Sequence, residues 1–290
     1  MKTARDCNGL NGIAIQVVRL FTAGTTFRGR HRLVNLVAHR LRRGVEVIEI
    51  GGLNVRIDHS LGVCRHMYFG TYETHLIRWI ARNLRPGHVA IEPGVNRGFV
   101  TGHLLQAVGP TGLVIGLEPS SRCFKMLSED NALDELTNLK LLHGALGQQE
   151  AQAAFCESDR IFSSGYSCLA DVGRPRDSRE YQIEVHTVDA LMARFNVERV
   201  HFLKLDIEGS EPAALAGAEN ALANGSIDAI MVETTLRRDS PGEARLSRKA
   251  IAILTTAGYR PHLMTNSGGL RPLELKPETE IRTDIMWTRK

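Results

Sequence analysis

The sequence predicts an α/β fold in which helices cover both faces of a mostly parallel sheet. From residue 88 onward, short apolar runs alternate with segments of helical periodicity, which is typical of such a sheet. A glycine-bearing turn follows the first of these runs and opens a helix. The 290 residues are 43% hydrophobic and 23% charged, as in a globular domain. We therefore expect ligands to bind beyond the carboxyl ends of the strands.

Residues 1–44 are predicted to form a basic N-terminal extension, followed by a single domain at 45–290 whose core spans 68–234. Residues 1–43 hold nine Lys or Arg and one acid, whereas the rest of the chain holds 27 basic and 31 acidic residues. The body is therefore mildly acidic. This charge distribution disfavours a protein that binds nucleic acid over most of its surface.

Residues 28–43 within the extension resemble a basic amphipathic helix. The apolar residues at helical spacing are Leu33, Leu36, Val37 and Leu41, and arginines surround them. Two interpretations stay open. The helix packs on the domain with its arginines solvated, which we favour, or it makes a peripheral contact with an anionic membrane.

The next two segments are predicted to be a hairpin and a helix. "VEVIEIGGLNVRID", residues 45–58, alternates apolar and polar residues on both sides of a Gly-Gly turn. "TYETHLIRWIARNLRPG", residues 71–87, has one apolar helical face and stops at Pro86 and Gly87.

Seven strands and five helices are predicted after this point. The strands are 88–92, 113–117, 139–142, 200–206, 227–233, near 259–264 and near 284–288, and the helices are 98–108, 120–132, 188–196, 210–223 and 243–257. "AQAAFC" and "YQIEVHT" predict an additional strand pair. The polar residues between them, 157–180, form a loop of the length typical of a lid, a substrate wall or a mobile connection.

The apolar runs and the cysteines indicate where in the cell the protein is expected. No run of 18 apolar residues is present, and the first apolar patch is interrupted by Gln16 and Arg19, unlike a secretory signal. The five cysteines are odd in number and form no C-x-x-C pair, which argues against a disulfide framework and a zinc site. We expect a cytoplasmic protein, either free or peripheral to the inner face of the membrane.

A nucleotide-type loop follows the first core strand. In "HVAIEPGVNRGFVTGHLL", Gly94 and Gly98 permit close backbone approach to a ligand, but the spacing fails both the dinucleotide and the phosphate-loop fingerprints. The second strand ends in Glu118, where an acid can accept both hydroxyls of a ribose. Asn96 and Thr101 add neutral polar groups. The pattern suits a nucleoside such as S-adenosylmethionine better than a pyrophosphate.

The chain resembles the FkbM family of S-adenosylmethionine-dependent methyltransferases over residues 68–234. The segments that carry the resemblance are "VAIEPGVNRGFVTGHLL", "GLVIGLEPSS", "GALG", "TVDAL", "FLKLDIEGSEPAALAGAENAL" and "IMVE". The family implies a class I methyltransferase fold, which is Rossmann-like, with seven strands of which the last is antiparallel. It also implies methyl transfer, usually to a hydroxyl oxygen.

The resemblance also implies site residues. Carried over by position, the cofactor-binding residues are Glu92, Gly94, Asn96, Gly98, Thr101, Glu118, Pro119, Ala145 and Leu146. The chain departs from the family at Glu92-Pro93, where Asp-Val is expected, and at Val95, where Ala is expected. Because Pro93 has no N–H, this departure puts cofactor affinity in question.

Three carboxylates follow the fourth predicted core strand. Asp206 or Glu208 is expected to orient the acceptor hydroxyl or to act as base, with Lys204 tuning the charge. Glu211 is expected to stabilise the start of the next helix, which Ser210 could cap. Glu233, at the end of the fifth strand, could join Asp206 as a magnesium ligand, although we favour a metal-independent enzyme.

Other candidate residues and functions receive less weight. His143, His186 and His201 adjoin strands and are expected to be structural, whereas His66, Tyr68 and Tyr72 could contact the cofactor. The leading hypothesis is an O-methyltransferase acting on a glycan, a glycolipid or another secondary metabolite. A catalytically idle binding protein that docks a membrane or partner through the basic extension is the alternative. The chain lacks the G-x-G-x-x-G fingerprint, which disfavours an NAD-dependent oxidoreductase. The net negative charge of residues 44–290 disfavours methylation of nucleic acids.

Overall fold

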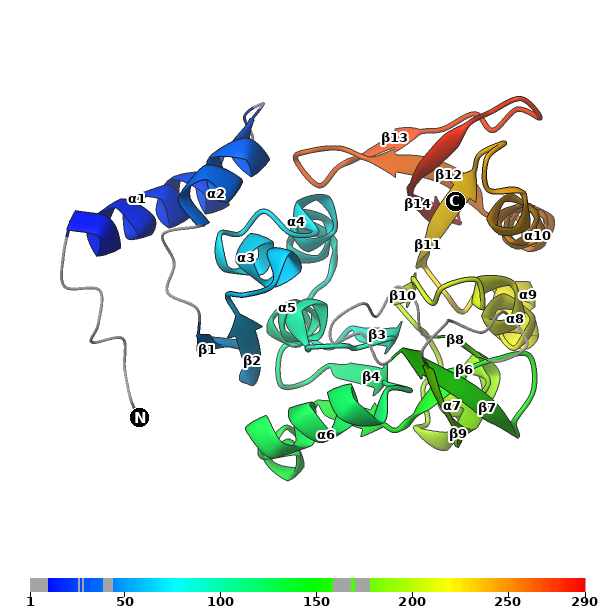
Figure 1. Ribbon diagram of the computed structural model, residues 1–290. Helices are drawn as coiled ribbons and strands as arrows, with labels where there is room; N and C mark the ends of the chain where they lie inside the picture. Colours follow the sequence, from blue (N-terminus) through cyan, green and yellow to red (C-terminus); the bar gives the residue numbers. More distant parts are fainter. Residues whose placement is uncertain are drawn as a thin grey trace.

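The central feature of the fold is an eight-stranded sheet with helices on both faces (Figure 1). The structure is a computed structural model that describes residues 10–25, 27, 29–38, 44–158, 168–169 and 178–289. The sheet order is β13-β12-β14-β11-β10-β3-β4-β5. The strands are β3 Val89–Pro93, β4 Leu113–Leu117, β5 Leu139–Leu142, β10 Phe202–Leu205, β11 Ala229–Leu236, β12 Arg260–Met264, β13 Leu270–Pro272 and β14 Ile281–Thr288.

The strand directions are those of a class I methyltransferase sheet. The pairs from β5 through β4, β3 and β10 to β11 are parallel, and β14 enters antiparallel between β11 and β12. All seven predicted core strands are confirmed. The eighth, β13, was not predicted, because three residues at a sheet edge carry no readable period; it pairs antiparallel with β12.

Two hydrophobic clusters lie on opposite faces of this sheet. Ala90, Val114 and Phe202 belong to the first cluster, and the residues that follow them, Ile91, Ile115 and Leu203, belong to the second. Successive side chains of a strand point to opposite faces, so continuous apolar runs are expected where both faces are buried. On the first face pack α4 Thr74–Asn83 and α5 Phe99–Val108; on the second pack α7 Val188–Arg194, α8 Glu211–Ala216, α9 Glu219–Asn224 and α10 Pro241–Thr256.

The predicted helix 210–223 is two helices, α8 and α9, separated at Gly217. A Cβ on Gly217 would lie 2.1 Å from the carbonyl oxygen of Gly147, so backbone packs on backbone there. The Asp189 carboxylate then accepts hydrogen bonds from the N–H groups of Asn220 and Ala221, at 2.9 and 3.0 Å, in the first turn of α9. A long-range contact therefore divides a locally continuous helical pattern.

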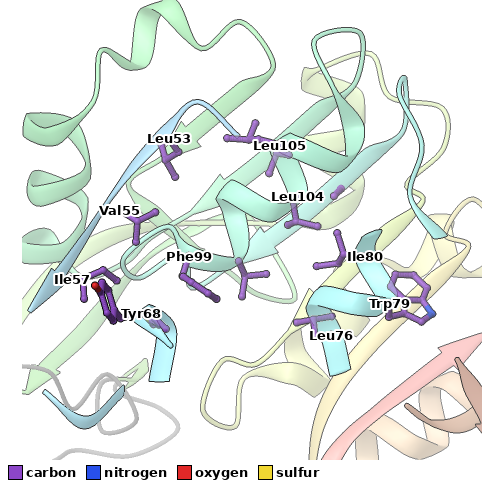
Figure 2. Close-up of a cluster of buried hydrophobic side chains, with 14 of the residues drawn as sticks. Leu53, Val55, Ile57, Tyr68, Leu76, Trp79, Ile80, Phe99, Leu104 and Leu105 are labelled. Carbon is purple, nitrogen blue, oxygen red and sulfur yellow. The ribbon is translucent and has the colours of Figure 1, made fainter. Parts of the chain in front are cut away.

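The N-terminal elements pack on α5 and α4 (Figures 1 and 2). The predicted hairpin is confirmed as β1 Val45–Ile50 and β2 Leu53–Asp58, and α2 Arg30–Ala38 falls within the predicted basic helix. Two helices that were not predicted, α1 Leu10–Gly24 and α3 Gly62–Tyr68, complete this layer. Leu53, Val55 and Ile57 of β2 are buried against α5 (Figure 2). The hairpin approaches α5 closely because Gly102 has no side chain: a Cβ there would lie 2.7 Å from the Ile50 carbonyl oxygen.

Residues of α1 and α2 join the same hydrophobic cluster as the hairpin and α4. Ile15, Val34 and Val37 are buried in it, and Thr22 donates a hydrogen bond to the Phe69 carbonyl oxygen at 2.8 Å. The division of the chain at residue 44 stays a prediction. Within the described part of the chain, no helix is long and apolar enough to cross a bilayer.

A second sheet, in the order β6-β9-β7-β8, lies beyond β4 and β5. Its strands are β6 Gly144–Leu146, β7 Ala151–Ser158, β8 Cys168–Leu169 and β9 Ser178–His186, so the predicted additional strand pair is confirmed as β7 and β9. The predicted loop 157–180 was too long, because β7 runs to Ser158, β9 begins at Ser178 and the short strand β8 lies between them. Its residues 159–167 and 170–177 lie outside the described residues, as do residues 28 and 39–43 of the basic helix.

Candidate active site

A pocket of about 300 Å³ opens at the carboxyl ends of β3, β4 and β10. Ten of the predicted site residues line it: Glu92, Gly94, Asn96, Glu118, Pro119, Ala145, Leu146, Lys204, Asp206 and Glu208. The other three do not. Gly98 precedes α5, Thr101 lies in the first turn of α5 and donates a hydrogen bond to Glu92, and Glu233 lies in β11.

The loop after β3 is a tight turn with three residues at positive φ. Gly94, Asn96 and Gly98 have φ of 74°, 55° and 80°. The N–H groups of Gly94 and Val95 both donate to the Leu117 carbonyl oxygen, at 2.7 and 3.1 Å, and fix the turn to the end of β4. These bonds hold the loop without any donor from Pro93. The departure from the family pattern at this position therefore leaves the turn intact.

Gly94 lines the pocket in a backbone conformation that favours glycine. Its φ of 74° lies in the left-handed region that residues with a side chain rarely adopt. A Cβ there would make ordinary contact with the Asp206 carbonyl oxygen, at 3.5 Å, so the backbone conformation and not a lack of space favours glycine.

Glu118 is buried at the end of β4 and bonded to the turns on both sides. Its Oε2 accepts a hydrogen bond from the Asn96 N–H at 2.6 Å, and its Oε1 accepts one from the Ser120 N–H at 2.8 Å. Burial raises the pKa of Glu118 to about 7, although both backbone hydrogen bonds act to lower it. A carboxylate has about four acceptor sites, so two remain for the hydroxyls of a ribose. These acceptor sites therefore fit the ribose of S-adenosylmethionine.

Glu92 lines the buried part of the pocket and interacts with the Lys204 cation of β10. It is 1% exposed and accepts a hydrogen bond from the Thr101 hydroxyl at 2.6 Å. Burial raises the pKa of Glu92 to about 7, and Lys204 opposes that rise. Thr101 therefore acts on the pocket through Glu92 and does not line it.

Lys204 and Asp206 form an ion pair at the end of β10. Their Nζ and Oδ2 atoms are 3.1 Å apart, and the Lys204 side chain is 6% exposed. Burial alone would lower the pKa of Lys204, but the Asp206 and Glu92 carboxylates raise it above its ordinary value. In turn, Lys204 holds the pKa of Asp206 below its ordinary value. The pair therefore stays ionised at neutral pH.

The turn after β10 presents Glu208 to the pocket in a strained conformation. Glu208 has φ of 54°, which is uncommon for a residue other than glycine and often marks a functional site. Burial, and then the Glu233 and Asp206 carboxylates, raise the pKa of Glu208 to about 7. Glu211 holds the turn itself: its Oε1 accepts hydrogen bonds from the N–H groups of Ile207 and Gly209, at 2.9 and 3.3 Å. Ser210 precedes α8 but its side chain makes no capping hydrogen bond.

Two further acids, not predicted from the sequence, lie around Asp206. Asp284 of β14 is in register with Glu233 of β11, and Glu73 begins α4 with φ of 45°. Burial raises the pKa of Glu233 and of Asp284 to about 7, and a side-chain interaction with Glu233 helps Lys204 to hold the pKa of Asp206 below its ordinary value. No sequence signal links these acids, because they meet only when β14 inserts beside β11.

The structure also adds contacts from the second sheet. Glu157 of β7 lines the pocket and accepts hydrogen bonds from the hydroxyls of Ser120 and Tyr181. The Tyr181 hydroxyl of β9 lies 3.0 Å from the Pro119 carbonyl oxygen and 2.8 Å from the Ser121 nitrogen. The second sheet is therefore bonded to the loop that carries Glu118. The predicted strand pair was the only signal for this contact.

Of the candidate aromatic residues and histidines, some line the pocket and others lie away from it. Tyr72 lines the pocket, whereas His66 and Tyr68 do not. His143 lies 3.2 Å from the Pro119 carbonyl oxygen. His201 precedes β10, at the end away from the pocket, and stacks on His88; His186 lies 3.8 Å from Glu150 and 3.5 Å from Glu184. In the described residues, no group of three or more His, Cys, Asp or Glu is arranged to hold a metal ion.

The sheet order and the pocket define an S-adenosylmethionine-dependent methyltransferase of class I. The model of the methyltransferase FkbM domain matches residues 92–261, which is more than half of the chain. The chain belongs to the FkbM methyltransferase family, and its cofactor is S-adenosylmethionine. No curated protein sequence matches it.

Solved structures with a similar chain path include three methyltransferases. An O-methyltransferase from Bacillus cereus in complex with SAH is 13% identical, with a TM-score of 0.43 and coverage of 95% of this chain and 100% of that one. A putative O-methyltransferase from Klebsiella pneumoniae is 11% identical, with a TM-score of 0.41 and coverage of 94% and 96%. Fibrillarin from Aeropyrum pernix with natively bound S-adenosyl-L-methionine is 15% identical, with a TM-score of 0.40 and coverage of 74% and 73%. At these identities the similarities carry no information on the acceptor.

Proposed function

We propose that the protein transfers the methyl group of S-adenosylmethionine to a hydroxyl of a glycan, a glycolipid or another secondary metabolite. The observation that carries this proposal is the position of Glu208 and Asp206 in the wall of the cofactor pocket, beside the Lys204 cation. Carboxylates accept hydrogen bonds from hydroxyl groups and can remove their protons. The site thus suits an oxygen acceptor.

The roles of the cofactor-binding residues follow from their contacts. When bound, S-adenosylmethionine supplies an activated methyl group, so the protein has only to align the acceptor and manage its proton. Glu118 holds the ribose hydroxyls with its free acceptor sites, while the Asn96 and Ser120 N–H groups fix its orientation. The turn at Gly94 would present backbone to the ligand at the end of β3.

The two acids at the acceptor side have different protonation properties and therefore different proposed roles. Lys204 keeps Asp206 ionised, so Asp206 can orient the acceptor hydroxyl through a hydrogen bond at any pH near neutrality. Glu208, with its pKa raised to about 7, has the basicity of an efficient general base and takes the hydroxyl proton. Lys204 is a positioning residue, because it acts through Asp206.

Cofactor binding and acceptor identity need separate tests. In calorimetry, the purified protein should bind S-adenosylmethionine, and Glu118→Ala should abolish the binding without unfolding the protein. Activity in EDTA should equal activity in buffer if the reaction needs no metal. An untargeted comparison of lipids and glycans from wild-type and deletion strains should show a species lighter by one methylene in the deletion. If the only species that loses a methyl group is an amine or a nucleic acid base, the O-methyl proposal is wrong.

The apolar stripe of α2 packs into the fold through Val34 and Val37, as the interpretation favoured from the sequence expected, so we propose in addition only that α1 contacts an anionic membrane surface. Val17, Leu20 and Phe21 form an apolar face of α1 and are 58%, 75% and 52% exposed. The surrounding sequence supplies the excess of basic residues that attracts anionic lipid. Co-sedimentation with vesicles of phosphatidylserine and phosphatidylcholine should fall in the variant Val17→Ser/Leu20→Ser/Phe21→Ser, which leaves the buried residues of α1 and α2 in place. Equal sedimentation of both proteins would rule this role out.

A further inference from the structure

The pocket extends past Glu118 to the second sheet. Glu118 follows β4 and Asp206 follows β10, and β3 lies between these two strands. On the other side of β4 lies β5, which leads directly into β6. At that end, residues of β6 and β7 line the pocket: Ala145, Leu146, Phe155 and Glu157. A nucleoside whose ribose lies at Glu118 and whose methyl donor faces Asp206 therefore places its base at β6 and β7.

Phe155 and Glu157 face the pocket from the same side of β7. They are two residues apart, and successive side chains of a strand point to opposite faces. Cys156, between them, does not line the pocket. The Phe155 ring is buried, and with the side chains of Ala145 and Leu146 it gives this end of the pocket an apolar wall beside the Glu157 carboxylate. An apolar wall with a placed polar group suits a flat heteroaromatic base.

Glu157 is held in one orientation and keeps capacity for a ligand. Its side chain is 9% exposed. Its Oε1 accepts a hydrogen bond from the Ser120 hydroxyl, and the Tyr181 hydroxyl lies 3.1 Å from its Oε2. The Arg122 Nε lies 3.9 Å from Oε1, which compensates the charge without a hydrogen bond. A carboxylate has about four acceptor sites, and the two hydroxyls occupy two of them.

The strand next to the main sheet offers the base no carboxylate. The three described residues of β6, Gly144–Leu146, carry no side chain that accepts a hydrogen bond. Adenine has an exocyclic amino group, and a donor that is removed from water without an acceptor costs about 1–3 kcal/mol. Among the described residues that line this end of the pocket beyond Glu118, Glu157 supplies the carboxylate.

We propose that Glu157 accepts a hydrogen bond from the exocyclic amino group of the adenine of S-adenosylmethionine, so that the second sheet sets the base specificity of the pocket. The inference rests on the proposed function for the position of the ribose at Glu118, and it is independent of the acceptor. Hypoxanthine carries a carbonyl oxygen in place of the amino group. That oxygen faces the Glu157 carboxylate as a second acceptor, so the site rejects it.

The proposal is tested by calorimetry with S-adenosylhomocysteine and S-inosylhomocysteine, which differ only at this position of the base. The wild-type protein should bind the adenosyl compound about ten- to a hundredfold more tightly, because a hydrogen bond to a charged group is lost in the inosyl compound. Glu157→Gln should lose most of this preference, since an amide can both accept from an amino group and donate to a carbonyl oxygen. Its affinity for the inosyl compound should equal or exceed that of the wild type.

The matched control is Glu184→Gln, in β9 of the same sheet. Its side chain is 62% exposed and does not line the pocket, so the variant should keep the wild-type preference. Equal binding of the two compounds by the wild type, or equal weakening of both by Glu157→Gln, would overturn the proposal. The wild-type comparison needs no variant, so it decides the matter even if Glu157→Gln does not fold.

The outcomes separate this inference from the proposed reaction. Both compounds lack the methyl group and are measured without an acceptor, so absence of methyl transfer leaves the binding result valid. Loss of the base preference alone overturns the role of Glu157 and leaves methyl transfer intact. If neither compound binds to the folded wild-type protein, the position of the ribose at Glu118 is wrong, and the role of Glu157 is overturned with it.

Discussion

Lys204 and Asp206 pair across 3.1 Å at the carboxyl end of β10, with Glu92 as a second carboxylate near the same cation. The pair lies at the boundary between the cofactor pocket and the acidic acceptor side. Removing a charged group from water is costly unless a partner compensates it. The Lys204 cation is therefore needed to keep the buried Asp206 and Glu92 carboxylates stable, and it is also part of the candidate site.

Replacing Lys204 by Met should destabilise the protein by on the order of 3 kcal/mol, because Asp206 and Glu92 lose their compensating charge. The loss should be smaller at pH 5 than at pH 8, since both acids can take up protons at low pH. Urea denaturation of the wild type and the variant at the two pH values measures this loss of unfolding free energy. Asp206→Asn is the comparison and should cost less, because Glu92 remains to pair with Lys204. Equal stability of Lys204→Met and wild type at pH 8 would refute the role of the cation.

The rate of methyl transfer should rise with pH and level off above about 7, as Glu208 loses its proton. Glu208→Gln should lack this rise and should be slower by about 10² to 10⁴. The measurement is the initial rate of cofactor turnover with the acceptor found by the strain comparison. Affinity for S-adenosylmethionine should not change. A Gln variant that keeps the wild-type pH profile would exclude Glu208 as the base.

Glu208→Gly offers an independent check on the strain at this position. Glycine adopts φ of 54° without steric cost, so the variant should be more stable than wild type by about 1 kcal/mol while losing the same activity. A gain in stability with a loss of activity separates the catalytic role from a folding role.

The cofactor-free protein should lose stability as pH rises from about 5 to about 7.5. Burial raises the pKa of five carboxyl groups to about 7: Glu92, Glu118, Glu208, Glu233 and Asp284. A group whose pKa is raised by folding binds its proton more tightly in the native state, so its stabilisation is complete below the unfolded pKa of about 4 and is lost through about 7. Each group contributes up to about 1.4 kcal/mol per pH unit to the slope.

Glu233→Gln tests one member of this set. The variant should show a shallower slope of unfolding free energy against pH, by on the order of 1 kcal/mol per unit between pH 5 and 7. Glu219→Gln, at an exposed position in α9, is the control and should follow the wild-type curve. A wild-type protein that becomes more stable across this range would contradict the burial of these acids.

Tyr181→Phe should weaken S-adenosylmethionine binding by about three- to tenfold, because the loop carrying Glu118 loses hydrogen bonds at Pro119 and Ser121. The effect should appear in KM for the cofactor and leave kcat nearly unchanged. Tyr259→Phe removes a comparable buried hydrogen bond, to the Ile227 carbonyl oxygen at 2.6 Å, away from the pocket. It should lower stability without changing cofactor affinity. Equal cofactor binding by both variants would show that the second sheet does not support the loop.

Local patterns predicted most of the core fold. The apolar runs before Pro93, Pro119 and Asp206 predicted three neighbouring strands, and the glycines at 94 and 98 predicted the turn between strand and helix. Such features depend on side-chain alternation and backbone freedom within a few residues, so they can be read without the rest of the chain. The division of α8 from α9 was missed because its cause, the carbonyl of Gly147, is remote in sequence.

The sequence by itself determined the chain order of the seven core strands and most of the helices between them, the family, and the acids that end the strands, since periodicity and motif spacing are local properties. Only the tertiary structure decided which charges share a low-dielectric environment. Glu92 meets Lys204, Tyr181 reaches Pro119, and Asp284 lies opposite Glu233 through contacts between distant segments. Burial and electrostatic energy depend on distance in space and on exclusion of water, and neither is encoded in separation along the chain.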